Sequence, residues 1–555
     1  MQRTLYLFLS IPLFLVGCAN QEQTTETTEA DLVLGKLEHG FTLNPATQEK
    51  FDEGLLLLHN FEYDDALTAF EAATALDSTE VLTHWGEAMC HYKALWRLQN
   101  TENGKAILER FGKTKEERLV SIEEPLEKDL WEVVEIMYGE GDFKERNQLI
   151  KDHLGAMHVS YPTNQEVAAF YVLSLIWATE EYGNGSEDLR LAASIADSII
   201  QVNPLHPGAL HYKIHALDGP TSANDALDAA DAYAGVAADA SHALHMPSHI
   251  YLAIGEWEGV INSNRRSYDA SVDRMEKLEL EDGARGYHAF AWLHYGLLQQ
   301  GQYEKAEGIL NEMLTLVPKD PTKGARGYLL GMQSRQLAES GMVDSETLLD
   351  LEVKADDIGI VAKSVRSFLR AQVAFENGDA AAIEEEMNWL VGHIQVDSIG
   401  MEDTGSAMCA AGTSRYAATE NGIKMAKVMH AQMGGMQAQL AGDEALFETQ
   451  MQTATELEDQ TDFPTGPPRI TNPSFEQYGE WLLANDRYEE AQEQFESALA
   501  RMPNRARSLK GKFLAHKGLN QMEEAAKVQE QLESLFTKAD AEVKSFLEDE
   551  RLSAL

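Results

Sequence analysis

The sequence has few cysteines and a shortage of basic residues. Cys18, Cys90 and Cys409 are its three cysteines, and none forms a Cys-x-x-Cys pair. Whether Cys90 and Cys409 form a disulfide stays open. Only 45 basic residues stand against 91 acidic ones, which gives a net charge of −46. Because phosphate binding needs a basic surface, this balance argues against a nucleic-acid partner.

Several catalytic signatures are also missing. The sequence contains no His-Glu-x-x-His motif, and no phosphate-binding loop, dinucleotide fingerprint or Ser-His-Asp arrangement appears at convincing spacing. Strand signals are nearly absent, whereas helical periodicity and alanine are abundant. We therefore expect an all-α protein, and no catalytic residue is assigned.

The only marked apolar run of the N-terminal region extends over about 12 residues, from Leu5 to Val16, which is too short for a membrane-spanning helix. It follows Arg3 and ends in Leu15-Val-Gly-Cys18, which resembles the lipobox of bacterial lipoproteins. The resemblance implies a signal peptide at 1–17, lipidation of Cys18 and attachment to the cell envelope. Because Ala19 follows the cysteine, the outer membrane is the expected location. Residues 18–44 are expected to form a flexible tether.

Small and large residues recur at the spacing of a two-helix repeat. In 472–505 the pattern is Gly479, Tyr488, Ala491, Phe495 and Pro503, and 47–80 and 287–320 follow it closely. The small residues let two helices approach, and the large ones fill the space between them. On these matches the chain resembles tetratricopeptide-repeat (TPR) proteins, which implies a right-handed α-solenoid of helical hairpins.

The middle of the chain keeps the 34-residue spacing, but its residues match the repeat pattern less well. Ala192, Ala226 and Val260 follow one another at 34-residue intervals and define repeats 173–206, 207–240 and 241–274. We expect an N-terminal solenoid at 45–320, irregular helical repeats with Gly/Pro loops at 321–470, and C-terminal repeats with a capping helix at 471–555.

Histidines gather in the two central repeats. His211 and His215 are four residues apart, as are His245 and His249, and the two pairs are offset by 34 residues. Each pair therefore lies on one helix face, at the same register positions, 5 and 9, of neighbouring repeats. We expect these four imidazoles to converge on one patch. The same register places Glu181 one helix away, where it would add a carboxylate.

Three interpretations of this patch stay open: a bound zinc, copper or iron ion, a polar or anionic ligand held without metal, and partly buried histidines bonded to their neighbours. The TPR resemblance implies that first-helix positions face a concave groove. Its expected lining is Trp177, His242, His288, Tyr295, His84, Glu87, His91 and Arg469. The predicted function is binding of a peptide, protein or small molecule in this groove, with a His-lined metal site. The alternative is a metal-dependent enzyme or a metal-handling protein.

Overall fold

The computed structural model describes residues 32–179, 186–318, 322–341, 353–399 and 418–548. Residues from Val33 onward form one compact unit, and of the other unit, Met1–Leu32, only Leu32 is described. Cys18, the signal peptide, most of the predicted tether and Glu181 lie outside the described residues. No described helix is both long and apolar enough to cross a membrane.

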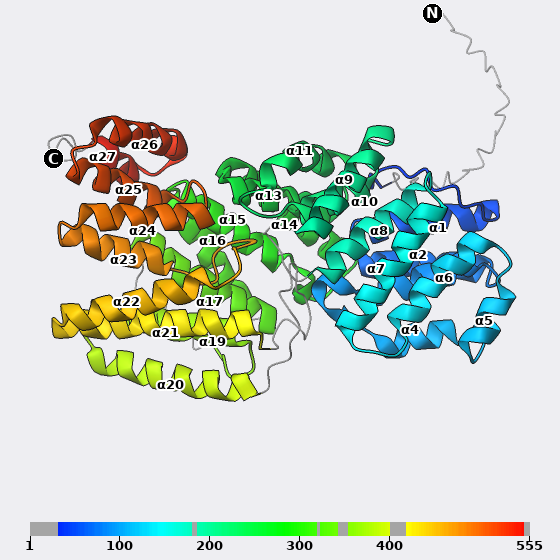
Figure 1. Ribbon diagram of the computed structural model, residues 1–555, viewed down its shortest axis with the longest axis horizontal. Helices are drawn as coiled ribbons and strands as arrows, with labels where there is room; N and C mark the ends of the chain where they lie inside the picture. Colours follow the sequence, from blue (N-terminus) through cyan, green and yellow to red (C-terminus); the bar gives the residue numbers. More distant parts are fainter. Residues whose placement is uncertain (1–31, 180–185, 319–321, 342–352, 400–417, 549–555) are drawn as a thin grey trace, which may run out of the picture. The chain divides into compact units, whose positions relative to one another are not determined.

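The predicted all-α solenoid is confirmed, because successive helices pack against one another as hairpins along the chain (Figure 1). The helices before the central histidines are α1 (Pro45–His59), α2 (Tyr63–Leu76), α3 (Val81–Cys90), α4 (Thr101–Leu108), α5 (Lys115–Ser121), α6 (Pro125–Met137), α7 (Phe143–Ser160), α8 (Gln165–Ala178) and α9 (Glu187–Val202).

Next come the helices that carry the central histidines and their partners. They are α10 (Pro207–Ala216), α11 (Leu227–Val236), α12 (Ser241–His245), α13 (Pro247–Ile254), α14 (Trp257–Lys277), α15 (Tyr287–Gln299) and α16 (Tyr303–Leu316). The segment between 274 and 287 ends α14 and then forms a single 3₁₀ turn at Asp282–Ala284.

The rest of the described chain is helical as well. It forms α17 (Lys323–Ser340), α19 (Ile360–Glu376), α20 (Ala380–Ile399), α21 (Glu420–Ala441), α22 (Glu444–Asp459), α23 (Ser474–Ala484), α24 (Tyr488–Arg501), α25 (Ala506–Gly518), α26 (Met522–Leu535) and α27 (Ala541–Glu548). The proline-rich segment between α22 and α23, here called the proline loop (residues 461–473), contains neither helix nor strand, as its prolines predict.

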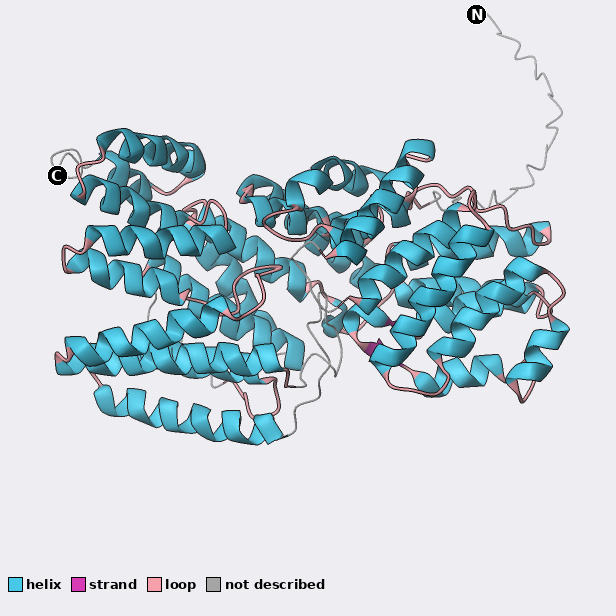
Figure 2. Cartoon of the chain, viewed as in Figure 1, coloured by secondary structure: helices cyan, strands magenta, loops and turns pink. Residues whose placement is uncertain are grey.

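One small hairpin departs from the helical pattern. Strands β1 (Tyr92–Lys93) and β2 (Leu98–Gln99) pair antiparallel around the 3₁₀ turn Ala94–Trp96, and Figure 2 shows this hairpin in magenta. This hairpin could not be predicted, because two-residue strands are too short to show alternation.

The repeat register explains how the hairpins pack. A Cβ atom on Gly54 would lie 2.8 Å from the ring of Phe70, and one on Gly479 would lie 2.8 Å from the ring of Phe495. Both aromatic rings are fully buried. Glycine at this position therefore lets the second helix press its large side chain against the first helix, as the spacing predicts.

Contacts between distant segments enclose the centre of the compact unit. The end of α1 packs against α10, where a Cβ on Gly208 would lie 2.3 Å from His59 Nδ1. Before α1, the Lys36 amide donates to the Leu205 carbonyl oxygen (2.8 Å). The start of α25 in turn reaches α15, because the Ala506 amide donates to Gln299 Oε1 (3.0 Å). Because His59 at the end of α1 packs against α10, the first repeat covers the face of α10 that carries the histidines.

Candidate metal centre

Six histidines, rather than the four expected, meet in two adjacent triads. His211, His215 and His242 form the first triad; His245, His249 and His288 form the second. In each triad, one ring nitrogen from every histidine lies within 4.8 Å of the others. Ring centroids of the two triads are 6.1 Å apart between His215 and His249.

The Nε2 atoms converge within each triad. In the first, His211 Nε2 lies 3.1 Å from His215 Nε2 and 3.2 Å from His242 Nε2. In the second, His245 Nε2 lies 3.2 Å from His249 Nε2 and 3.0 Å from His288 Nε2. Ligand nitrogens around a tetrahedral ion with bonds of ~2.0–2.1 Å are about 3.3 Å apart. The spacing therefore suits one ion in each triad.

The other ring nitrogen, Nδ1, is held by the surrounding protein. His211 Nδ1–H donates to the His59 carbonyl oxygen (2.7 Å), and His249 Nδ1–H donates to Asp218 Oδ2 (2.7 Å). His245 Nδ1 lies 2.7 Å from Asn264 Oδ1, and the amide of Asn264 donates to the Val260 carbonyl oxygen. The Asn264 oxygen therefore faces the ring, so His245 also carries its proton on Nδ1.

This tautomer assignment leaves two lone pairs facing each other. When both rings are neutral with their protons on Nδ1, His245 Nε2 and His249 Nε2 present lone pairs to each other at 3.2 Å. Burial lowers the pKa of His245 to about 3, so the ring is neutral at neutral pH. Burial likewise lowers the pKa of His211 to about 3. Neutral imidazoles with lone pairs on Nε2 are the form that binds a metal ion.

The two triads share one register rule. Each combines positions 5 and 9 of one repeat with position 2 of the next, which is His242 for the first triad and His288 for the second. The sequence predicted both position-2 histidines as part of the groove lining and not as members of the metal site. The residues inserted at 275–286 separate His288 from His242 by 46 positions, whereas the two histidine pairs are offset by 34.

Aromatic side chains pack against each triad, among them Phe61 at the first and Trp292 at the second. The ring of Phe61 lies 4.3 Å from that of His211 and stacks on His242 at 5.5 Å. Trp292 lies 4.8 Å from His245 and 4.7 Å from His249, centroid to centroid. His211, His215, His245 and His249 are consequently at most 3% exposed, rather than open in a groove.

A third group has a different proton arrangement. His59, Glu166 and His206 are fully buried and also lie close enough to hold an ion. However, the Ala209 amide donates to His206 Nδ1 (3.2 Å), so the proton of a neutral His206 is on Nε2 and faces Glu166. His59 Nε2 lies 2.6 Å from Glu166 Oε2, and its Nδ1 lies 2.8 Å from the hydroxyl of Tyr212. These bonds orient His59, whose carbonyl in turn orients His211.

Other residues predicted for the groove lie elsewhere. His84 and Glu87 contact Arg110, Glu87 through an ion pair of 2.7 Å, and the partly buried His91 follows the end of α3. Trp177 is buried against Tyr92. Of the predicted groove lining, His288 and Arg469 line a cavity of about 270 Å³ beside the second triad, together with Trp292.

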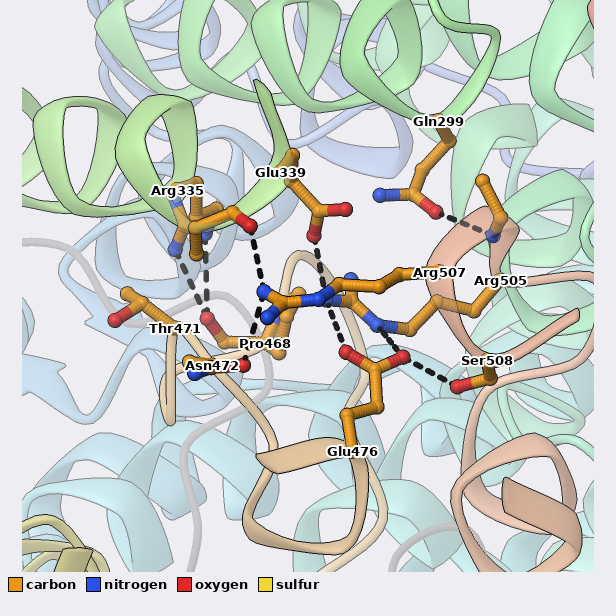
Figure 3. A network of polar contacts seen from close by, with 12 residues as sticks. Gln299, Arg335, Glu339, Pro468, Thr471, Asn472, Glu476, Arg505, Arg507 and Ser508 are labelled. Carbon is orange, nitrogen blue, oxygen red and sulfur yellow. Dashed lines mark hydrogen bonds and ion pairs between the residues drawn. The ribbon is translucent and has the colours of Figure 1, made fainter. Parts of the chain in front are cut away.

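The Tyr295 hydroxyl accepts a hydrogen bond from Arg505. Arg505 belongs to a buried ionic network that anchors the proline loop (Figure 3). Arg505 is fully buried and ion-pairs with Glu476 (2.7 Å) and Glu339 (2.5 Å), and it donates to the Tyr295 hydroxyl (2.8 Å). Beside it, Arg335 donates to the carbonyl oxygen of Pro468 (3.2 Å). The network therefore fixes the loop that forms one wall of the cavity.

Comparisons with solved structures found proteins built from helical repeats. A human IFIT1 dimer with PPP-AAAA is 13% identical over 87% of this chain and 89% of its own, with a TM-score of 0.36. Yeast Tom70 is 12% identical over 92% of this chain and 96% of its own, with a TM-score of 0.29. The TPR domain of P58(IPK) is 13% identical over 86% and 99%, with a TM-score of 0.21.

No protein-family model and no curated protein matches the sequence. At TM-scores below 0.5, the likeness to these structures does not bear on what the chain binds. The packing of successive helices in the described residues by itself shows a helical-repeat solenoid.

Proposed function

We propose that this protein is a helical-repeat scaffold that holds two transition-metal ions in adjacent three-histidine sites. The observation that carries the proposal is the approach of His245 Nε2 and His249 Nε2 to 3.2 Å while Asn264 and Asp218 bond the two Nδ1 atoms, so that two neutral rings would direct their Nε2 lone pairs at each other. Such an arrangement is repulsive without a cation and favourable with one.

The ligand set favours copper. In the described part of the chain each triad consists of imidazoles, and such sites bind divalent ions most tightly at copper, with zinc next to it in the series. The common non-haem iron site takes two histidines and a carboxylate, and among the described residues no carboxylate belongs to either triad. The burial of the triads supports the enzyme or metal-handling alternative over a partner bound in an open groove. Binding of a peptide or protein elsewhere on the solenoid stays a prediction.

Elemental analysis tests the proposal. The full chain is loaded with copper, freed of unbound ion and measured by mass spectrometry. We expect two equivalents, one equivalent in His211→Ala, one in His245→Ala and none in the double variant. His153→Gln is the matched control, because His153 bonds a backbone carbonyl outside both triads. If both single variants keep two equivalents of copper, or if the wild type binds none, the proposal is contradicted.

We further propose that Cys18 anchors the scaffold to the cell envelope, in the outer membrane. The support is the Leu15-Val-Gly-Cys18 sequence after a short apolar run. Labelled palmitate should enter the wild-type chain in a bacterial host and not the Cys18→Ala variant. Incorporation into both would contradict lipidation at this residue.

A further inference from the structure

The cavity beside the second triad is lined by distant parts of the solenoid. Its walls include His288 and Trp292 of α15, the first turns of α17, α19 and α21, and much of the proline loop. Of the six clustered histidines, His288 is the one that lines it. A molecule in this cavity would therefore approach the second three-histidine site rather than the first, which Phe61 covers.

The charge of the cavity lining is opposite to that of the chain. The lining has two acidic residues, Glu458 and Asp462, and five basic ones: Arg97, Lys323, Arg335, Arg469 and Arg501. The whole chain has twice as many acidic as basic residues. Because the basic side chains outnumber the acidic ones, the lining carries a net positive charge, which attracts anions.

Three helices begin at the cavity and add partial positive charge. The lining includes Lys323 and Gly324 at the start of α17, Ile360 at the start of α19, and Asn421 and Gly422 at the start of α21. The residue before α19, Gly359, also lines the cavity and makes no side-chain capping bond. Helix N-termini present backbone N–H groups and favour anions.

Two buried arginines provide independent evidence for an anionic ligand. Arg501 is only 9% exposed, and its Nε has no hydrogen-bond partner among the described residues, although Nη2 donates to Thr461. Arg335 is equally buried and donates to the Pro468 carbonyl oxygen, with no carboxylate of the described chain in an ion pair with it. Glu458 and Glu339 act on Arg501 and Arg335 electrostatically without forming ion pairs with them. A ligand carboxylate in direct contact would compensate these buried cations more fully.

The remaining wall is aromatic and apolar. It includes Trp292, Phe463 and Met425, and the guanidinium of Arg501 lies 5.2 Å from the centroid of Phe463. A cavity of roughly 150 Å³ holds benzene. The volume of about 270 Å³ therefore accommodates one aromatic ring and a charged group.

We propose that this cavity binds a small aromatic carboxylate, with its carboxylate at Arg335 and Arg501 and its ring extending toward His288. The inference rests on the proposed function, because the metal ion of the second triad is the reactive group that such a ligand would reach. The buried ionic network contributes by fixing the proline loop before the ligand arrives, which lowers the entropic cost of binding.

Calorimetric titration of the copper-loaded full chain with benzoate tests this proposal. Benzyl alcohol is the neutral probe of similar shape, and inorganic phosphate tests binding of an anion without a ring. We expect benzoate to bind at least tenfold more tightly than either probe. Arg501→Gln should weaken benzoate about tenfold. Arg469→Ala removes one positive charge from the lining and should weaken benzoate as well, by a smaller factor. Arg469 lies on the exposed rim, so its variant should fold even if the buried substitution does not. Arg265→Ala, on the exposed face of α14, is the matched control.

Metal content measured on the same samples separates the two proposals. Two equivalents of copper with no benzoate binding, or with equal binding by all variants, would overturn the cavity proposal and leave the metal sites standing. Equal affinity for benzoate and benzyl alcohol would also overturn it. If benzoate binding depends on the arginines but the samples contain no copper, the proposal that the ligand reaches a metal ion is wrong. The proposed function is then wrong as well.

Discussion

Replacement of Asp218 by asparagine should weaken the second metal site selectively. Asp218 Oδ2 accepts the Nδ1 proton of His249 at 2.7 Å, and both side chains are almost fully buried. Asparagine keeps the shape of the Asp218 side chain but removes its negative charge. That charge makes Nε2 of His249 a better donor to a metal ion. Loss of such a supporting carboxylate costs about 10- to 100-fold in metal affinity, which corresponds to about 1.4–2.8 kcal/mol.

Competition of the loaded protein against a copper chelator measures both sites separately. In Asp218→Asn we expect one equivalent to keep its wild-type affinity and the other to be released at about 10- to 100-fold lower chelator concentration. Asp231→Asn is the control, since Asp231 bonds the hydroxyl of Tyr251 on the exposed surface. An unchanged release profile, or an equal loss at both sites, would refute the assignment of Asp218 to the second site alone.

Three further predictions concern stability. Arg505→Met should lower the free energy of unfolding in urea by about 3–5 kcal/mol, because it leaves two buried carboxylates unpaired; a loss below about 1 kcal/mol would refute the importance of the network. Gly511→Ala should lower the free energy of unfolding by about 1–3 kcal/mol, since its Cβ would lie 2.1 Å from an aromatic carbon. Gly392→Ala, with open space around it in α20, should instead raise the free energy of unfolding by about 0.5–1 kcal/mol. Equal effects of the two substitutions would contradict the packing. Burial lowers the pKa of His294 to about 3, so between about pH 6.5 and 3 the unfolded chain binds a proton that the folded chain does not, and stability falls with falling pH. In His294→Gln the slope of unfolding free energy against pH should be smaller by about 1.4 kcal/mol per pH unit in that window; an unchanged slope would show that His294 does not contribute.

The repeat architecture could be predicted because its causes are local. Gly54 and Phe70, or Gly479 and Phe495, follow a fixed spacing that brings one helix against the next, and the structure places helices at those positions. The same spacing brought His211, His215, His245 and His249 to equivalent places. Helix periodicity then predicted correctly that each pair shares a face.

The division into two triads could not be predicted, because it depends on contacts between distant residues. His59 is 152 positions from His211, yet its carbonyl fixes that ring, and Phe61 of the same segment covers the first triad. Asp218 and Asn264 carry no sequence signal that ties them to His249 and His245. The cavity likewise joins α15 to the proline loop, which follows more than 160 residues later.

Anomalous X-ray diffraction from crystals of the copper-loaded full chain tests the central claim most directly. At the copper absorption edge we expect two separate peaks, one at coordination distance from the Nε2 atoms of His211, His215 and His242, and one at coordination distance from those of His245, His249 and His288. A single peak shared by both triads, peaks at other residues, or no peak in either triad would contradict the two-site account.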